Sequence, residues 1–364
     1  MKLPLISIIT PTYNAALTVE KALLSVINQQ YKTVEHLFID GGSSDETTTI
    51  IRRYQLQYPH IRLLSEKDNG LYDAINKGMV LCTGDWMYIM GADDAFYNDR
   101  VLSDIVAQGW FGKEQIVYGN VLIAGDAPWA KDNSLYDGPF TLEKLYMKNL
   151  CHQSIFYPRS VISRVGYYSN KYPVTADWDY NMHCYSQYKF AYTGLTIAIF
   201  NAGGKSSDDD VHSFFKDMPE KVIQYFQLNP RDKIHEKPDS PFYYPLALYR
   251  EKEHTTLIKK LEDEVARLKT ALHASQETLR QKESELGKTR ELTHQRMEQF
   301  KHSLEEKEQH YAKTISDARR NTEKLRAELE EHKKVINSLV NSYTWKTGRF
   351  FLAPLRMFRK KKVE

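Results

Sequence analysis

Apolar and polar positions along the first part of the chain follow two different periods. Continuous apolar, β-branched runs at 5–10 ("LISIIT") and 34–40 ("VEHLFID") predict two buried strands. The stretch between them, 17–29, carries apolar side chains at helical spacing and predicts a helix with an inner face of Val19, Ala22, Leu23, Val26 and Ile27. Buried parallel strands are apolar on both faces, so the pattern is typical of a βαβ unit.

The same alternation continues further along the chain. The next elements are expected at 45–58 (helix), 61–66 (strand), 71–81 (helix) and 86–90 (strand). Such alternation predicts an α/β sheet with helices on both faces. Ligands of these sheets bind beyond the carboxyl ends of the strands. We therefore expect the polar residues at those ends, 10–14, Asp40, Asp93 and Asp94, to meet in one crevice.

Beyond residue 227 the composition changes, which divides the chain into a head at 1–227 and an extension. Residues 228–250 are proline-rich and indicate a linker. Residues 251–340 contain one glycine and no proline. Their apolar residues recur every three or four residues, or every seven, which is typical of a coiled coil. The seam is Ile258, Leu261, Val265, Leu268, Leu272, Leu279, Leu286, Met297, Phe300, Leu304, Tyr311, Leu325, Leu329, Ile336 and Leu339.

Two expectations follow for this segment. We expect one uninterrupted helix, on the order of 130 Å long at the usual rise per residue, that joins copies of the chain into a homo-oligomer. The alternative is a single charged helix or a disordered tail.

The last segment, 341–364, combines aromatic and basic residues in "SYTWKTGRFFLAPLRMFRKKK". Aromatic side chains with lysine and arginine suit the interface of an anionic membrane, so the segment predicts attachment to a membrane surface. A helix that docks onto the head or onto a partner protein is the alternative.

Composition and charge narrow the setting. The chain has 364 residues and a formal net charge of +3, too small to argue for a nucleic-acid partner. Its three cysteines form no CxxC pair, which suits a reducing compartment and argues against structural zinc. The N-terminus lacks a signal-peptide pattern, and no window reaches the roughly 18 apolar residues of a spanning helix. We expect a cytoplasmic protein, peripheral on the inner face of the cytoplasmic membrane.

Adjacent carboxylates in "GADDAF" are the sharpest chemical signal. Asp93 and Asp94 follow a predicted buried strand, where like charges repel and raise each other's pKa unless a cation compensates. Mg²⁺ or Mn²⁺ prefers such oxygen ligands and would bridge them to a diphosphate. An exposed turn is the alternative. The chain has neither GxGxxG nor GxxxxGK[ST], so hydride transfer and a P-loop have little support.

A second carboxylate pair, Asp177 and Asp179, lies in "TADWDYNM" at the start of a predicted helix. Asp177 near the helix start is able to point into a cleft, where a carboxylate serves as the general base that deprotonates an attacking hydroxyl. Either aspartate could instead cap the helix.

Five segments together resemble the family 2 inverting glycosyltransferases of the GT-A fold, particularly those of bacterial surface-polysaccharide synthesis. They are "SIITPTYN", "FIDGGSSDET", "KDNGLYDAINKGMVLCTGDWMYIMGADD", "CHQSIFYPRSVISRVGYYSNKYPVTADWDYNM" and "NAGGKSS", in this order within about the first 215 residues. The resemblance does not cover the heptad segment.

The resemblance implies a nucleotide-diphosphate sugar as donor. It assigns Pro11, Tyr13 and Asp40 to the base and ribose. It assigns Asp94, with Asp93, to a divalent ion that binds the donor diphosphate.

For the acceptor, the resemblance implies that Asp177 activates the hydroxyl in a direct, inverting displacement. His152 and Gln153 match an "HQ" pattern of the relevant subgroup and are expected to line the acceptor side. A buried, hydrogen-bonded structural histidine is the alternative for His152.

Two departures affect the contacts. Ile75 stands where many relatives have arginine, so the diphosphate contacts are expected from Lys77 or Lys205, with Asp73 also on the donor side. Ala176 stands where many relatives have glutamate, which removes one acceptor contact.

We therefore expect a hexosyltransferase-type enzyme that moves a sugar to a lipid-linked or polysaccharide acceptor in bacterial cell-surface glycan synthesis of the O-antigen or capsule kind. The alternatives are a nucleotidyltransferase, for which "TPTYNAAL" lacks the glycine- and arginine-rich signature, and a scaffold that binds a nucleotide sugar without turnover.

Overall fold

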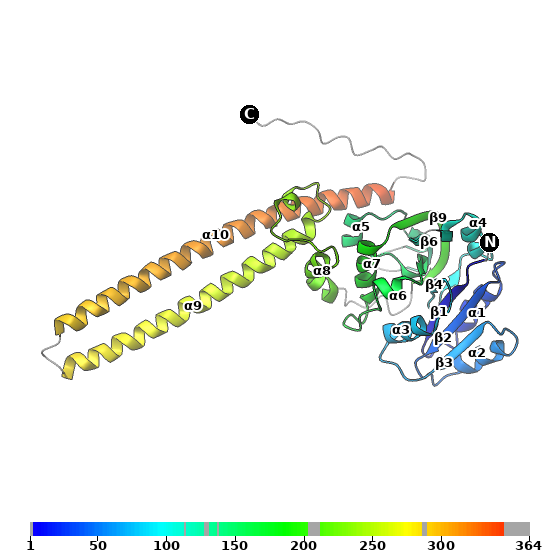
Figure 1. Ribbon diagram of the computed structural model, residues 1–364, viewed down its shortest axis with the longest axis horizontal. Coiled ribbons are helices and arrows are strands. Elements are labelled where there is room, and N and C mark those ends of the chain that lie inside the picture. Colours follow the sequence, from blue (N-terminus) through cyan, green and yellow to red (C-terminus); the bar gives the residue numbers. More distant parts are fainter. Residues whose placement is uncertain are drawn as a thin grey trace, which may run out of the picture.

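The structure is a computed structural model that describes residues 3–112, 114–126, 131–136, 138–202, 212–285 and 290–345. A compact α/β head carries the N-terminus, and two long helices project from it side by side (Figure 1). The predicted α/β head is confirmed, and its sheet is mixed.

The described part of the head contains one sheet in the order β3-β2-β1-β4-β8-β6-β9-β5, with β7 paired to β6. The strands are β1 (Ile6–Thr12), β2 (Val34–Asp40), β3 (Ile61–Ser65), β4 (Trp86–Ile89), β5 (Ala95–Phe96), β6 (Ile116–Ala124), β7 (Leu135–Tyr136), β8 (Ile155–Pro158) and β9 (Phe190–Asn201). Strands β1 to β4 are parallel, as the sequence predicts, whereas β8 is antiparallel to β4 and to β6.

Short helices cover the sheet and connect its strands. They are α1 (Val19–Ile27), α2 (Thr47–Gln55), α3 (Leu71–Leu81), α4 (Val101–Ala107), α5 (Leu142–Met147), α6 (Val161–Arg164), α7 (Ala176–Gln187) and α8 (His212–Tyr225), with 3-10 turns η1 (Trp110–Gly112), η2 (His152–Ser154) and η4 (Lys233–Glu236). Helix α3 lies so close to β1 that a Cβ on Gly78 would approach Ile9 Cγ2 to 2.3 Å. Glycine at 78 is therefore needed for this packing.

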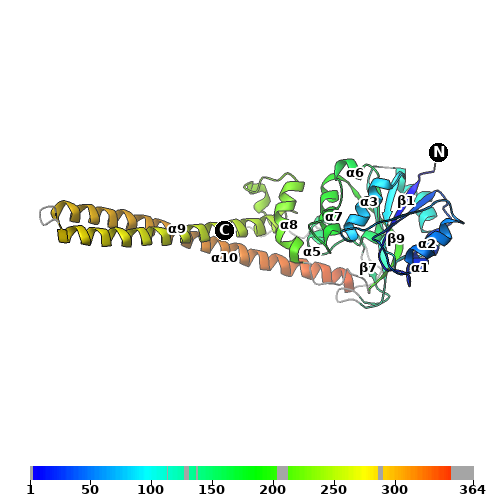
Figure 2. The ribbon, with the colours of Figure 1, turned by 90° about the horizontal axis from the view of Figure 1, so that it is seen from below.

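The extension is a helical hairpin of α9 (Tyr243–Glu285) and α10 (Arg290–Trp345). The two helices run antiparallel along each other in both views (Figures 1 and 2). At about 1.5 Å per residue they are roughly 65 and 84 Å long. The prediction of one uninterrupted helix is therefore wrong, because the chain reverses between Glu285 and Arg290.

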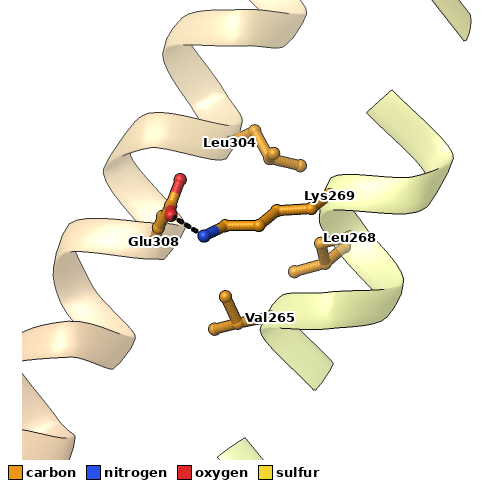
Figure 3. A pocket seen from close by; sticks show the side chains of 5 residues that line it. All are labelled: Val265, Leu268, Lys269, Leu304 and Glu308. Atoms are coloured by element: carbon orange, nitrogen blue, oxygen red, sulfur yellow. Dashed lines mark ion pairs between the residues drawn. The ribbon is translucent and has the colours of Figure 1, made fainter. Parts of the chain in front are cut away.

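Contacts between the helices use the predicted apolar seam. Figure 3 shows Val265 and Leu268 of α9 facing Leu304 of α10, beside an ion pair of 2.7 Å between Lys269 Nζ and Glu308 Oε1. Leu304 is buried and the seam positions of α9 from 258 to 279 are partly buried. The apolar seam of α9 therefore packs against α10 of the same chain.

The base of the hairpin is attached to the head. Tyr243, Ala247 and Leu329 form a small buried cluster, and the Tyr243 hydroxyl donates to Glu328 at 2.7 Å. The Tyr244 ring stacks on Tyr146 of α5 with 6.4 Å between centroids. Helix α9 thus begins inside the segment 228–250 that was predicted to be a linker. Within the described residues, no helix is long and apolar enough to cross a membrane.

We expect Leu329→Ala to loosen the hairpin at its base. Leu329 is 4% exposed, and removing a buried leucine side chain costs about 2–5 kcal/mol. Circular dichroism at 222 nm should show helix loss at a lower temperature than in wild type. Phe300→Ala on the same helix is the control, because Phe300 is 44% exposed and its removal should leave the melting curve unchanged. Equal melting of both variants would contradict this assignment.

Candidate active site

The first part of the site is the carboxyl edge of β1, β2 and β3. Parallel register places Thr12 opposite Asp40, and Asp40 opposite Ser65. Pro11 lies buried within β1, whereas Tyr13 follows the strand with 60% of its surface exposed. The predicted base-binding residues therefore come together at one edge, and of these Tyr13 offers its side chain to a ligand.

Asp40 is fully buried and its carboxylate is occupied by its own turn. Oδ1 accepts from the hydroxyls of Thr12 (3.1 Å) and Ser43 (2.5 Å), and Oδ2 accepts from the Ser65 hydroxyl (2.7 Å) and from the backbone N–H groups of Gly42 and Ser43 (3.1 and 3.0 Å). These hydrogen bonds outweigh the effect of burial and hold the pKa of Asp40 below its ordinary value. The side chain shapes the turn and leaves no free acceptor position for a base.

Asp94 forms the second part of the site, in the loop after β4. Its Oδ2 accepts from the Gly91 backbone N–H (3.1 Å) and the Gln153 amide (2.8 Å), and its Oδ1 accepts from the Asn201 backbone N–H (3.1 Å). Burial, followed by repulsion from Asp93, raises the pKa of Asp94 to about 6. Asp93 is half-buried beside it and more open to the surface.

Asp177 forms the third part, in the first turn of α7. Its Oδ1 accepts from the Trp178 backbone N–H (2.9 Å) and lies 3.1 Å from the Tyr72 hydroxyl, which also lies 2.8 Å from the Val174 carbonyl oxygen. Burial and the nearby Asp177 charge raise the pKa of Tyr72 well above its ordinary value, so the phenol stays protonated and donates.

The 3-10 turn η2 connects the two acidic groups. His152 Nδ1 lies 3.4 Å from Asp177 Oδ2, and the next residue, Gln153, donates to Asp94. Gln153 Oε1 in turn accepts from the Cys151 thiol at 2.8 Å, which fixes which end of the amide faces Asp94. The structure thus separates the predicted acceptor-side pair, since His152 lies with Asp177 and Gln153 lies with Asp94.

The predicted donor-side pair on α3 lies elsewhere. Lys77 Nζ contacts Glu66 (2.8 Å), the Lys67 carbonyl oxygen (3.1 Å) and Asp73 (3.6 Å). Asp73 also accepts from the Asn69 N–H at 3.0 Å. These contacts place Asp73 and Lys77 against the β3–α3 loop. Lys205, the other candidate for the diphosphate, lies outside the described residues.

Asp179 differs from Asp177 although only two residues separate them. It is buried toward α8, where it accepts from the Tyr225 hydroxyl at 2.6 Å and lies 3.6 Å from Lys221 Nζ. Asp179 therefore joins α7 to α8, and Asp177 is the carboxylate of this pair that faces His152.

Asp93 and Asp94 fit a hard divalent cation that arrives with a phosphate ligand. The described residues hold no group of three histidine, cysteine, aspartate or glutamate side chains arranged for a metal. Mg²⁺ commonly takes only one or two protein carboxylates and completes its shell with water and substrate phosphates. Two adjacent carboxylates, one with a raised pKa, have the charge and ligand type for such an ion.

Sequence reasoning missed three contributors, Tyr72, Cys151 and the Asn201 backbone. All three fall inside segments quoted for the family resemblance. For Tyr72 and Cys151 the available signal was a polar side chain near a predicted site residue. The contact from Asn201 uses the backbone N–H at the end of β9, so the identity of its side chain does not indicate it.

The mixed α/β head is of the GT-A-like class. Residues 7–161 match the family described as "Glycosyl transferase family 2". The chain is 36% identical over 228 residues to a "PGL/p-HBAD biosynthesis glycosyltransferase" of Mycobacterium bovis, a match that covers 60% of this chain and 86% of the relative.

Among solved structures, the fold resembles S. aureus TarS residues 1–349 in complex with UDP-GlcNAc, with a TM-score of 0.54, 16% identity, and coverage of 66% of this chain and 72% of TarS. TarS 1–349 without a named ligand matches 89% of this chain and 91% of TarS with a TM-score of 0.52. This chain belongs to glycosyl transferase family 2 and is a glycosyltransferase.

We expect Asp94→Asn to change how stability depends on pH. A carboxyl whose pKa rises from 3.8 to about 6 on folding makes the folded protein bind more protons between those values, so the free energy of unfolding falls as pH rises through this window. The fall attributable to Asp94 should be roughly 3 kcal/mol. Urea denaturation at several pH values from 4 to 7.5, in EDTA, measures the free energy of unfolding. This free energy should fall more steeply with pH in wild type than in Asp94→Asn. Parallel profiles would contradict the raised pKa.

Proposed function

We propose that the chain transfers a sugar from a nucleotide-diphosphate sugar to a lipid-linked or polysaccharide acceptor in bacterial cell-surface glycan synthesis. The observation that carries this proposal is the turn η2, where His152 contacts Asp177 and Gln153 contacts Asp94. Two adjacent residues thereby connect Asp177, the proposed base, with Asp94, the proposed ligand of a diphosphate-bound cation. The name of the mycobacterial relative, "PGL/p-HBAD biosynthesis glycosyltransferase", supports a glycosyltransferase of a biosynthetic pathway.

Asp177 acts as the general base in the proposed reaction. The acceptor hydroxyl oxygen attacks the anomeric carbon while Asp177 takes its proton. The bond between the anomeric carbon and the diphosphate oxygen breaks, and the nucleoside diphosphate leaves with the electron pair. A single displacement of this kind inverts the anomeric configuration. Tyr72 and His152 hold the carboxylate in place.

Asp93 and Asp94 are the residues that would hold Mg²⁺ or Mn²⁺ together with the donor diphosphate. Such an ion would supply Lewis-acid stabilisation of the charge on the leaving group. Gln153 and the Gly91 and Asn201 N–H groups keep Asp94 oriented, and these donors favour its ionised form.

Asp177→Asn should lower turnover at least 100-fold, because general base catalysis contributes about 10²–10⁴-fold. Binding of the nucleoside diphosphate with Mn²⁺, measured by calorimetry, should stay within twofold of wild type. The donor for the turnover assay comes from a screen of nucleotide sugars for thermal stabilisation.

Asp179→Asn is the matched control on the same helix. It removes the ion pair with Lys221 of α8 and should lower the melting temperature while turnover of the folded protein stays near wild type. Full turnover by Asp177→Asn would show that Asp177 is not the general base. If wild type turned over none of the donors, the alternative of a scaffold that binds a nucleotide sugar would be favoured.

We further propose that the C-terminal tail holds the enzyme on the inner face of the cytoplasmic membrane. Its aromatic and basic residues suit an anionic surface, and residues 346–364 lie outside the described structure. Self-association is the role proposed for the hairpin, on which the apolar side chain of Leu257 is 44% exposed.

Deletion of residues 343–364 should release the protein from vesicles that contain anionic lipid, with donor hydrolysis unchanged. Flotation with anionic and with neutral vesicles measures the partitioning. The deletion removes a cluster of basic residues, so binding of the full chain should also weaken as salt is raised. Unchanged flotation after deletion would exclude the tail as the anchor.

A further inference from the structure

The base of the helical hairpin rests on α5, a short helix of the head. The ring of Tyr244 in α9 stacks on the ring of Tyr146 in α5, and Tyr146 is 1% exposed, so the stack lies inside the junction. Helix α10 also contacts α5. The helices α5, α7 and α8 lie at the end of the head from which the hairpin projects (Figures 1 and 2). Both helices of the hairpin therefore contact the same short helix.

Helix α5 also holds the residue next to the proposed base. Trp178 Nε1 donates to the Leu145 carbonyl oxygen at 2.7 Å, and Leu145 directly precedes Tyr146 in α5. The Trp178 ring is buried and packs edge-on against Phe215 of α8, with 4.8 Å between centroids. The backbone N–H of Trp178 donates to Asp177 Oδ1 at 2.9 Å. Trp178 therefore contacts α5 through its ring and Asp177 through its backbone.

The chain that leaves α5 leads into the turn that contacts the second oxygen of the base. It reaches η2 at His152, whose Nδ1 lies 3.4 Å from Asp177 Oδ2. Asn181 fixes the connecting segment to α7, because its Nδ2 donates to Asn149 Oδ1 (2.9 Å) and to the Leu150 carbonyl oxygen (3.1 Å). Asn181 is fully buried and lies one helical turn after Asp177, on the same face of α7. Each oxygen of Asp177 thus contacts a group whose position depends on α5.

We propose that the helical hairpin positions the general base. The stack of Tyr244 on Tyr146 fixes α5, and α5 in turn fixes Trp178 and η2 around Asp177. The inference rests on the proposed function, because it requires Asp177 to act as the base. A base must lie within hydrogen-bond reach of the proton that it takes, so small displacements lower the rate strongly. The hairpin is then part of the acceptor side of the site, in addition to its proposed role in self-association.

The proposed metal site depends more on other segments. Asp94 accepts from Gln153 of η2, but also from the N–H groups of Gly91 and Asn201, which belong to the loop after β4 and to the end of β9. Loosening α5 should therefore impair proton transfer to Asp177 more than it impairs binding of the nucleoside diphosphate. This difference separates a positioning role of the hairpin from a general loss of structure.

The assay is hydrolysis of the donor by the full chain with Mn²⁺, in which water takes the place of the acceptor hydroxyl. The water oxygen attacks the anomeric carbon, Asp177 takes the proton, and the nucleoside diphosphate leaves with the electron pair of the broken bond. The donor is the nucleotide sugar that most raises the melting temperature of wild type in a screen of UDP-, GDP-, dTDP-, CDP- and ADP-sugars.

Tyr244→Ala removes the ring that stacks on Tyr146 and should lower kcat at least tenfold, since a misplacement of about 1 Å can cost up to 10²-fold in rate. The Kd of the matching nucleoside diphosphate, measured by calorimetry with Mn²⁺, should stay within twofold of wild type, which also shows that the head is folded. Tyr244→Phe keeps the ring and should restore the wild-type kcat. Trp178→Phe loses the indole N–H and should lower kcat as Tyr244→Ala does.

Lys252→Ala is the matched control on α9. Lys252 joins the hairpin to the head at α8, where it pairs with Glu220 and donates to the Lys216 carbonyl oxygen at 3.3 Å. An exposed ion pair contributes little to stability, and this one does not involve α5. The variant should therefore keep kcat within twofold of wild type.

The background of Asp177→Asn distinguishes positioning of the base from other effects. With no base to displace, Tyr244→Ala should change the residual kcat of Asp177→Asn less than twofold. If Tyr244→Ala lowers kcat equally in both backgrounds, or if it leaves kcat of the otherwise wild-type chain unchanged, the hairpin does not position the base and the transferase proposal stands. If Asp177→Asn itself keeps full turnover, the base assignment is wrong and this inference falls with it.

Discussion

The buried carboxylate of Asp94 is the group on which the arrangement of the active site depends. Burial raises its pKa to about 6, so the ionised form at neutral pH requires the hydrogen bonds that surround it. Those bonds come from the loop after β4, from the turn η2 and from the end of β9. One side chain therefore joins three segments, the outermost of which, at Asp94 and Asn201, are 107 residues apart in sequence.

The turn η2 carries this constraint to the base. His152 contacts Asp177, and the adjacent residue Gln153 contacts Asp94. The two carboxylates are therefore linked through two consecutive residues, which limits the distance between them. Displacement at an anomeric carbon requires the base and the leaving group on opposite sides of one atom, and small errors in such a geometry lower the rate strongly. A short, hydrogen-bonded turn suits this purpose better than a mobile loop, because its own bonds limit how far either end moves.

The strands and helices of the head could be predicted because their residues repeat at the periods of buried parallel strands and amphipathic helices. The positions of Thr12 and Asp40 at the carboxyl ends of β1 and β2, and of Asp93 and Asp94 after β4, followed from the parallel order alone. The direction in which each side chain points could not be predicted from the parallel order. Asp177 and Asp179 have the same chemistry and lie in the same turn of α7, yet one faces His152 and the other faces Tyr225. Only tertiary packing distinguishes them.

The extension shows the same limit at a larger scale. A heptad pattern of apolar residues indicates that a helix packs against an apolar partner. It does not indicate whether that partner belongs to another chain or to the same chain. Here α9 and α10 cover each other, with ion pairs such as Arg319–Glu262 (2.7 Å) and Arg326–Glu251 (2.6 Å) along the contact. Each of these exposed pairs contributes little to stability. Their alignment between antiparallel helices nevertheless favours one register, so charge pattern and not apolar spacing distinguishes the hairpin from other pairings of the same seam.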